Sequence, residues 1–412
     1  MGEHSIFDFE TPCFVFDEAE LRANFSDFRT ALQTAWSPQS AVAYSVKTNP
    51  LPWILGIAKD EHCLAEVVSD AEYDWARSAG FSPEQIVFNG PIKSEQYVHD
   101  ALAAGSIVNV DSERELAWLA QWAQTHTETA HVGIRVNFDL ESWCPGQTVT
   151  GSAGGRFGFC YENGELARAI QILVSCAPAV RISGLHMHVT TQSRSLDVYE
   201  ALAQMTVTVI EEFGLDPDYV DLGGGFFGGG PNNKGAYDGY AQTIAATLKK
   251  VCDPARVKLI VEPGGAIVCT PGRYLGRVID VKDTTIDRFV VTELSRVNID
   301  HEQKKTSYVH RVHLHDQAEV IDSAERQTIP RQVICGFTCM ESDRLCVWED
   351  ELALQPGDMI ELLNAGAYSM SFTPDFFIQH PPAVYAVSPQ GEAVMVRKPY
   401  HIESRVQNDS LQ

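Results

Sequence analysis

A lysine stands at the end of an apolar segment that reads as a buried strand. Residues 43–50 are AYSVKTNP, so Lys47 comes after the strand-like segment and directly before a turn. A lysine amine whose pKa is lowered by burial is suited to forming a Schiff base with a carbonyl group. A lysine with an ion-pair partner, or one that reaches to solvent, is the alternative. The choice depends on the reactive groups that accompany it.

A run of glycines follows another strand-like segment. Residues 221–230 are DLGGGFFGGG, and glycines allow several backbone N–H groups to approach an anion such as phosphate. The run differs from the dinucleotide pattern G-x-G-x-x-G and lacks the Walker lysine, so a nucleotide site is poorly supported. A flexible loop without a ligand is the alternative.

Two more apolar segments end in titratable groups. Glu262 ends the segment in VEPGG, where a buried carboxylate needs a partner such as a protonated ring nitrogen. His186 and His188 alternate with apolar residues in GLHMHVTTQ, so both point to one face of their strand. His186 would also suit a core position. A metal would need a third ligand at a familiar spacing, which the sequence lacks, so we predict no metal site.

Composition limits the class of protein. The 412 residues carry a net charge of −24, which argues against nucleic acid or an anionic membrane as a partner. Apolar runs fall short of the roughly 20 residues of a membrane span. The N-terminal residues MGEHSIFDFETP have no apolar core of the signal-peptide kind. The ten cysteines lack the paired spacing of metal ligands, which suggests reduced thiols. We therefore expect a cytoplasmic protein.

Strand-like and helix-like segments alternate along most of the chain. About eight such units lie between residues 37 and 285, and this repeat predicts a parallel barrel with its catalytic groups at the C-terminal ends of the strands. After residue 285, β-rich segments such as QVICGF and RLCVWE predict an antiparallel domain. We expect residues 37–285 to form the barrel and residues 286–412 the β-domain, with residues 1–36 contributing to the latter.

Lys47, His188, the glycine run and Glu262 occur in the order and spacing of the fold-type III pyridoxal-phosphate decarboxylases. From about residue 10 to 385 the chain resembles diaminopimelate, ornithine and carboxynorspermidine decarboxylases. The resemblance rests on TPCFVFD, YSVKTN, AEVVSDAE, VNVDSERE, GLHMHVTTQ, DLGGGF, VEPG, CGFTCMESD and LLNAGAYSMSF. It implies an α/β fold with a (β/α)8 TIM-like barrel and a C-terminal antiparallel β-domain, as in alanine racemase. It also implies pyridoxal 5'-phosphate as the cofactor.

The resemblance implies a role for each matching residue. Lys47 would bind the cofactor covalently, His188 would stack on the pyridine ring, and Glu262 would pair with the ring nitrogen. Cys339 would reach the site of the partner subunit in a homodimer with shared sites and return a proton to the α-carbon. The residues expected near the phosphate are Thr191, Gly223, Gly224, Gly225 and Tyr368.

Two positions depart from the family's pattern. Gly265 stands where many relatives have an arginine, so a cation near the phosphate or substrate is missing. Met340 stands where relatives have a glutamate or aspartate that binds the distal ammonium of the substrate. Glu341 or Asp343 could take over that task.

The segment 289–316 also differs from its relatives. It brings Arg296, Lys304 and Lys305 into an acidic protein, and these would suit a substrate with extra carboxylates. A citrate-linked amino acid of siderophore biosynthesis is such a substrate, and a solvated surface loop is the alternative. The expected substrate contacts are Met340, Glu341 and Arg296.

Several functions agree with this pattern. The main expectation is decarboxylation of an amino acid or of a conjugate such as a citrate-linked amino acid, and the alternative substrate is diaminopimelate or carboxynorspermidine. A racemase would share the lysine and the barrel, but the cysteine motif favours decarboxylation. A non-catalytic binding protein is disfavoured because Lys47, His188, Glu262 and Cys339 are all present.

Overall fold

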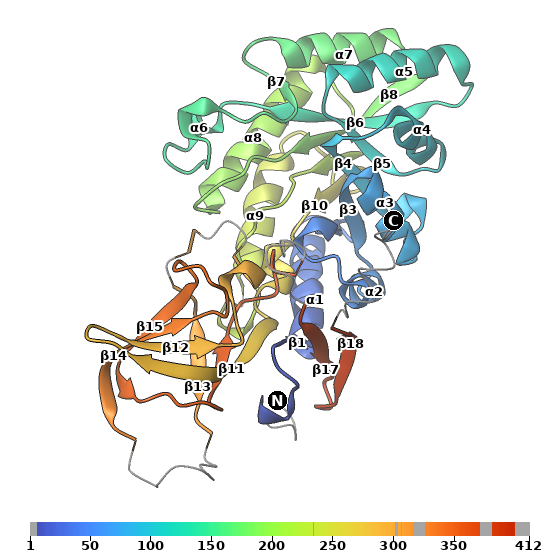
Figure 1. The fold of residues 1–412 in the computed structure, drawn as a ribbon. Helices are drawn as coiled ribbons and strands as arrows, with labels where there is room; N and C mark the ends of the chain where they lie inside the picture. Colours follow the sequence, from blue (N-terminus) through green and yellow to red (C-terminus); the bar gives the residue numbers. More distant parts are fainter. Residues whose placement is uncertain are drawn as a thin grey trace, which may run out of the picture. The chain divides into compact units, whose positions relative to one another are not determined.

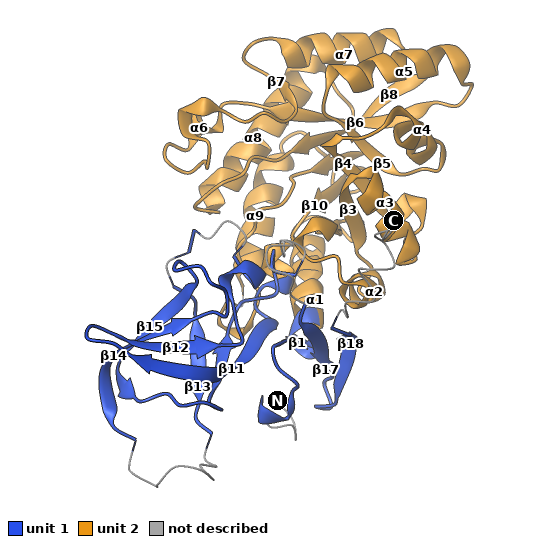
Figure 2. Ribbon diagram, in the orientation of Figure 1, with its two compact units in different colours: residues 1–21, 268–412 blue, residues 22–267 orange. Residues whose placement is uncertain are grey.

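The computed structural model describes residues 6–233, 235–300, 304–305, 307–315, 326–370 and 381–399. The chain forms two compact units, which Figure 2 colours separately. Unit 1 comprises residues 1–21 and 268–412, and unit 2 comprises residues 22–267. The domain ranges expected from the sequence, 1–36, 37–285 and 286–412, stay a prediction.

Unit 2 contains a closed barrel of eight parallel strands, as the βα repeat predicts. The strands follow one another in the order β2, β3, β4, β5, β6, β8, β9 and β10, and β10 pairs with β2 to close the ring. A two-residue strand, β7, adds to β6. Their bounds are β2 Ala41–Ser45, β3 Leu64–Ser69, β4 Ile86–Ile92, β5 Ile107–Val110, β6 Ala130–Asn137, β7 Phe159–Cys160, β8 Val180–Met187, β9 Tyr219–Asp221 and β10 Lys258–Val261.

Helices surround this barrel (Figure 1). Several begin at a serine whose hydroxyl accepts a backbone N–H of the first turn: Ser69 from Glu72 at 3.2 Å, and Ser195 from Val198 at 3.4 Å. Their bounds are α1 Glu18–Ala35, α2 Pro52–Asp60, α3 Asp70–Ser78, α4 Glu95–Ala103, α5 Glu113–Thr125, α6 Leu140–Trp143, α7 Glu165–Ser175, α8 Leu196–Phe213, α9 Ala236–Leu248 and α10 Gly265–Val268. Short 3-10 turns are η1 Ile6–Asp8, η2 Val46–Thr48, η3 Pro83–Gln85, η4 Gly151–Ala153, η5 Pro231–Asn233 and η6 Arg296–Asn298.

Tyr219 fills part of the barrel interior. Its ring leaves no room for a side chain at Gly184, where a Cβ would come within 2.0 Å of a ring carbon. Its hydroxyl donates to Asn109 Oδ1 at 2.8 Å, and Ala43 and Leu64 belong to the same buried cluster. The interior is therefore packed, and the C-terminal strand ends are left to carry polar groups.

Unit 1 contains a mixed sheet that is largely antiparallel. β1 pairs with β17 and β12 with β14 in the parallel sense, while its other pairs are antiparallel. Its strands are β1 Cys13–Asp17, β11 Gly272–Asp283, β12 Arg288–Thr292, β13 His310–His313, β14 Thr328–Cys335, β15 Arg344–Leu352, β16 Met359–Leu362, β17 Ala383–Val387 and β18 Ala393–Arg397. Within the described ranges, none of the helices in either unit has the length and apolar character to span a membrane.

Candidate active site

Lys47 lies in the turn η2, directly after strand β2. Its Nζ is 3.1 Å from Oε2 and 3.4 Å from Oε1 of Glu66, near the end of the neighbouring strand β3. Ser45 donates its hydroxyl to the same Oε2 at 2.6 Å, so the carboxylate is fixed from two sides. The Lys47 side chain is 42% accessible and that of Glu66 only 2%. The expectation of a buried lysine is therefore wrong, because the turn carries the amine beyond the strand end.

Glu262 follows β10 and is buried. Asn89 donates its side-chain N–H to Glu262 Oε1, and His186 Nε2 lies 3.4 Å from Oε2. Burial opposes ionisation of the carboxyl group, but His186, a hydrogen bond with Asp221, and His188 together lower the pKa of Glu262 below its ordinary value. The site thus holds a buried negative charge. Pairing of Glu262 with a ring nitrogen stays a prediction.

His188 follows β8 and carries a neutral ring. Desolvation by the surrounding protein is the largest effect on the imidazole, and the positive charge of Arg135 is the second. Together they lower the pKa of His188 to about 3. The backbone N–H of Gly224 donates to His188 Nδ1 at 3.2 Å, which assigns the ring proton to Nε2. A flat and uncharged imidazole is suited to lie against an aromatic cation.

The glycine run after β9 forms a tight loop between His188 and Glu262. Gly223 and Gly225 have φ of +64° and +87°, a conformation that favours glycine. A Cβ at Gly223 would come within 2.5 Å of His188 Cβ, and one at Gly224 within 2.5 Å of the Glu262 carbonyl oxygen. These close approaches require the glycines. Phosphate binding by Gly223, Gly224 and Gly225 stays a prediction.

Thr191 lies in the segment that follows His188. It forms an isolated β-bridge with Thr148, and the adjacent Gln192 N–H donates to the Gln147 carbonyl oxygen at 2.8 Å. The loop that contains Gln147 and Thr148 therefore holds Thr191 in place. Its predicted contact with phosphate is not tested by these contacts.

A buried ion pair contacts the backbone of His188. Arg135 on β6 donates to Asp111 Oδ2 at 3.0 Å and to the His188 carbonyl oxygen at 3.3 Å. Nearby, Lys93 Nζ lies 3.1 Å from Glu115 Oε1, with both side chains inaccessible. Our sequence reasoning missed these residues, although Asp111 and Glu115 lie in the segment VNVDSERE.

Five predicted site residues belong to unit 1, whereas Lys47 belongs to unit 2. The structure thus leaves their membership of the Lys47 site a prediction. Tyr368 has a left-handed backbone, with φ of +52°, and its side chain is partly exposed. The other four residues are Cys339, Met340, Glu341 and Arg296.

The loop between β14 and β15 carries Cys339, which is exposed. The carboxylate of Asp343 organises this loop from the inside. It accepts hydrogen bonds from Ser295 Oγ at 2.9 Å, the Arg296 N–H at 2.9 Å and Thr338 Oγ1 at 2.7 Å. The Asp343 carboxylate is therefore occupied by hydrogen bonds within the protein.

Glu341 and Arg296 differ in their surroundings. The Glu341 side chain is 97% accessible and lies 3.4 Å from Arg344. The Arg296 guanidinium is buried, and it donates to the carbonyl oxygens of Ser342 at 2.8 Å and Lys305 at 2.7 Å. The Arg296 guanidinium thus forms hydrogen bonds within the protein, which argues against a contact with the substrate.

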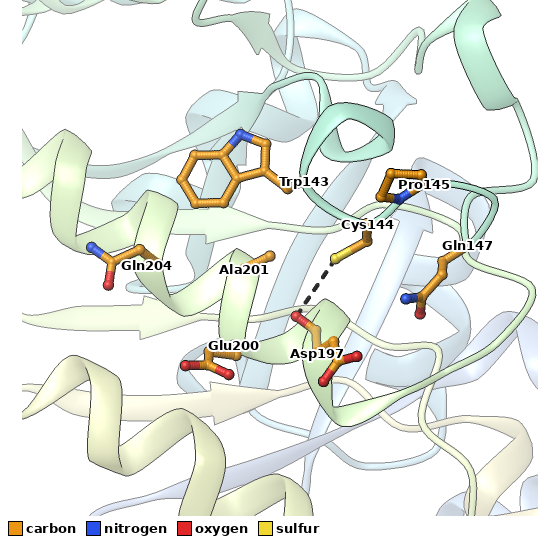
Figure 3. Close-up of a pocket in the computed structure, with 8 residues that line it drawn as sticks. All are labelled: Trp143, Cys144, Pro145, Gln147, Asp197, Glu200, Ala201 and Gln204. Carbon is orange, nitrogen blue, oxygen red and sulfur yellow. Dashed lines mark hydrogen bonds between the residues drawn. The ribbon is translucent and has the colours of Figure 1, made fainter.

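A separate pocket of about 500 Å³ lies between the short helix α6 and the first turns of α8 (Figure 3). Trp143 and Cys144 form one side, and Asp197 and Glu200 form the other. The Cys144 thiol donates to the Asp197 carbonyl oxygen at 3.7 Å. None of the residues predicted from the sequence lines this pocket, so it is distinct from the strand-end site.

The strand ends of unit 2 thus combine an accessible amine, a buried carboxylate, a neutral imidazole and a glycine loop. The carboxylate complements a protonated ring nitrogen, and the imidazole offers a flat surface to such a ring. The amine of Lys47 can react with a carbonyl group. Together these groups fit an aromatic aldehyde that carries a positive ring and an anionic substituent.

Comparison with known proteins agrees with this chemistry. The family described as "Pyridoxal-dependent decarboxylase, pyridoxal binding domain" matches residues 18–269. Diaminopimelate decarboxylase of Zymomonas mobilis is 28% identical over 407 residues, which cover 97% of this chain and 92% of that protein. The L-glutamyl-[BtrI acyl-carrier protein] decarboxylase of Niallia circulans is 26% identical over 406 residues, covering 95% and 91%.

A solved structure has the same fold. Diaminopimelate decarboxylase from Methanocaldococcus jannaschii superimposes with a TM-score of 0.83 at 24% identity. The match covers 98% of this chain and 93% of that one. The barrel with an added β-domain is therefore the fold of that enzyme too.

Proposed function

Because the chain belongs to the pyridoxal-dependent decarboxylase family, we propose that it removes one α-carboxyl group of diaminopimelate. Its cofactor is pyridoxal phosphate and its reaction is the decarboxylation of an amino acid. The observation that carries the choice of diaminopimelate is that relatives named for that activity align over nearly the whole chain.

Residues of the strand-end site would hold the cofactor. The Lys47 amine would bind covalently to the aldehyde carbon of the cofactor. Glu262 would face the ring nitrogen of the cofactor, and His188 would lie against the ring. The loop at 223–225 would surround its phosphate, a role that the positive φ of Gly223 and Gly225 supports. When bound, the cofactor would supply the electron sink that decarboxylation at the α-carbon requires.

The remaining work belongs to groups of the chain that hold or move protons. Glu66 accepts hydrogen bonds from the Lys47 ammonium and would orient that amine toward the aldehyde. Glu262 stays anionic and would keep the ring nitrogen protonated. The Cys339 thiol would return a proton to the α-carbon, from the partner subunit of a homodimer.

The surroundings of Arg296 favour diaminopimelate over a citrate-linked amino acid. A conjugate with extra carboxylates needs cationic partners, and the Arg296 guanidinium is engaged by Ser342 and Lys305. The main expectation from the sequence, a siderophore-type conjugate, therefore has less support than its alternative.

A conjugated substrate remains the second candidate because of Met340. A thioether gives no attraction to a distal ammonium, and the Niallia circulans relative is named for a glutamyl group carried on a protein. A conjugate whose far end is polar or large would suit such a position. Gly265, in place of the arginine of many relatives, agrees with an altered substrate end.

Carbon dioxide release tests the proposal. Purified protein loaded with pyridoxal phosphate should show its highest kcat/KM with diaminopimelate among diaminopimelate, ornithine, lysine, carboxynorspermidine and citryl-diaminopropionate. Lys47→Ala provides the background rate. A higher kcat/KM for a conjugate would overturn the choice of diaminopimelate. Inversion at the α-carbon without carbon dioxide would indicate a racemase.

A further inference from the structure

A second buried carboxyl group lies beside Glu262. Asp221 ends strand β9, is inaccessible to solvent, and is paired in register with Ile260 of β10. Two residues beyond Ile260, the N–H of Glu262 donates to the Gly223 carbonyl oxygen at 2.7 Å. The polar atoms of Asp221, Glu262 and His186 lie within 4.8 Å of one another. Two buried carboxyl groups thus lie side by side.

The hydrogen bonds around Asp221 are unequal at its two oxygens. Oδ1 accepts the backbone N–H of Gly223 at 2.9 Å. Among the described residues, no donor reaches Oδ2. Two ionised carboxylates this close in a buried site repel each other, and a single proton between them replaces the repulsion by a hydrogen bond.

We propose that Asp221 is protonated in the folded protein and donates this proton in a hydrogen bond to Glu262. Asp221 is then a positioning residue: it fixes the Glu262 carboxylate as the negative charge that faces the cofactor's ring nitrogen. The inference rests on the cofactor of the family and is independent of which amino acid is the substrate.

The ionisation of the neighbouring groups agrees with this arrangement. Burial, and next the charge of Glu262, raise the pKa of Asp221 well above its ordinary value, whereas the pKa of Glu262 is lowered. Opposite shifts in adjacent carboxyl groups are typical of a pair that holds one proton. The other titratable groups facing Asp221 are His186, Glu66 and Tyr219; burial raises the pKa of Tyr219, so its hydroxyl is neutral.

Asparagine can replace a protonated aspartate at this position. Its Nδ2–H can donate to Glu262, and its Oδ1 can accept the Gly223 N–H, so Asp221→Asn keeps both hydrogen bonds and the charge. Asp343→Asn is the matched control, because the Asp343 carboxylate accepts from Ser295, Arg296 and Thr338. The side-chain NH2 group of an asparagine at this position would face hydrogen-bond donors, so hydrogen bonds would be lost.

Two measurements on the full chain distinguish the protonation states. The dissociation constant for pyridoxal phosphate should change less than about threefold in Asp221→Asn, since the charge near the ring nitrogen is kept. Asp221→Leu removes the hydrogen bond and should weaken binding by about tenfold or more. A tenfold weakening in Asp221→Asn itself would mean that the native group is ionised, and would overturn the proposal.

The pH dependence of unfolding gives the second measurement. An unfolded aspartate titrates near 3.9, so above that pH folding takes up a proton at Asp221 and wild-type stability falls as pH rises toward the raised pKa. The unfolding constant of cofactor-free wild type, divided by that of Asp221→Asn, should rise by up to about tenfold per pH unit between about pH 6.5 and 8.5. Asp343→Asn should be destabilised throughout.

A flat ratio over this range would contradict the proposal. Should Asp221→Asn fail to fold, the infrared spectrum of the wild-type protein decides. A carbonyl band of a protonated carboxylic acid at pH 8, lost in Asp221→Leu, supports the proposal, and its absence from the wild type overturns it. None of these readouts uses substrate turnover, so failure of the proposed function is detected separately.

Discussion

The Lys47 amine lies 3.1 Å from the Glu66 carboxylate, and the two groups differ strongly in exposure, 42% against 2%. The carboxylate is held inside the barrel rim by the Ser45 hydroxyl, while the amine reaches it from the solvent side. The lysine is therefore oriented by a fixed acceptor, although it is not buried.

Glu66→Gln should slow the reaction of the Lys47 amine with the cofactor. The neutral glutamine amide orients the amine less well than the carboxylate does, and it is a weaker proton acceptor. We expect kcat/KM and the rate of pyridoxal phosphate incorporation to fall by about tenfold or more, as for the loss of a hydrogen bond to a charged group. Glu72→Gln is the control, since Glu72 accepts the Val68 N–H at 2.9 Å and belongs to helix α3. Unchanged rates in Glu66→Gln would remove Glu66 from the site.

At saturating pyridoxal phosphate, Glu262→Gln should still be loaded with cofactor but should slow decarboxylation. A neutral amide no longer holds the ring nitrogen protonated, so kcat should fall on the order of 10²- to 10³-fold. Absorbance of the bound cofactor and steady-state carbon dioxide release check the two parts. Wild-type rates would make Glu262 a structural residue.

His188→Phe should make the protein less sensitive to acid. An unfolded histidine titrates near 6.5, whereas the folded His188 has a pKa of about 3. Between these values the unfolded wild type binds a proton that the folded protein excludes, so wild-type stability falls as pH falls.

The ratio of the wild-type unfolding constant to that of His188→Phe should thus rise as pH falls from 7 to 5. The limit is about tenfold per pH unit, and partial exposure of the ring makes the effect smaller. Chemical denaturation at fixed protein concentration measures it. A ratio that is constant with pH would show that His188 keeps the ordinary histidine pKa in the folded state.

Mixing two inactive variants tests whether the site is shared between subunits. If Cys339 serves the Lys47 site of its partner, Lys47→Ala mixed with Cys339→Ala should recover about a quarter of the sites, because half of the dimers are mixed and each has one intact site. Subunit exchange is verified with differently tagged chains. No recovery after exchange would place both residues in one chain's site.

Met340→Glu tests the distal end of the substrate. A carboxylate at this position would attract a distal ammonium, so the ratio of kcat/KM for diaminopimelate to that for citryl-diaminopropionate should rise by about five- to tenfold. Glu341→Gln is the control, because the Glu341 side chain is 97% accessible, and it should change the ratio less than about twofold. An unchanged ratio in Met340→Glu would show that position 340 lies away from the substrate.

The barrel could be predicted from the sequence because its strands and helices have local patterns. Polar residues at the ends of apolar segments, Lys47, Glu262 and His188, stand out for the same reason. The burial expected for Lys47 was wrong because Lys47 lies in a 3-10 turn, η2, beyond the end of the strand. The antiparallel character of the β-domain was predicted, whereas its two parallel pairs join strands distant in sequence.

The partners of the site residues could not be predicted, since they depend on contacts between distant segments. Asn89 donates to Glu262 across 173 positions in the sequence. Asp221 precedes the glycine run and has no local sign of sharing a proton with Glu262. Such pairs become visible only when the closed order of strands is known.

The product formed from diaminopimelate tests the central claim most directly. The holoprotein should convert diaminopimelate into equal amounts of lysine and carbon dioxide, measured together by mass spectrometry, and Lys47→Ala should yield neither. Absence of both products from a preparation that retains pyridoxal phosphate, under conditions where a known diaminopimelate decarboxylase is active, would contradict the account.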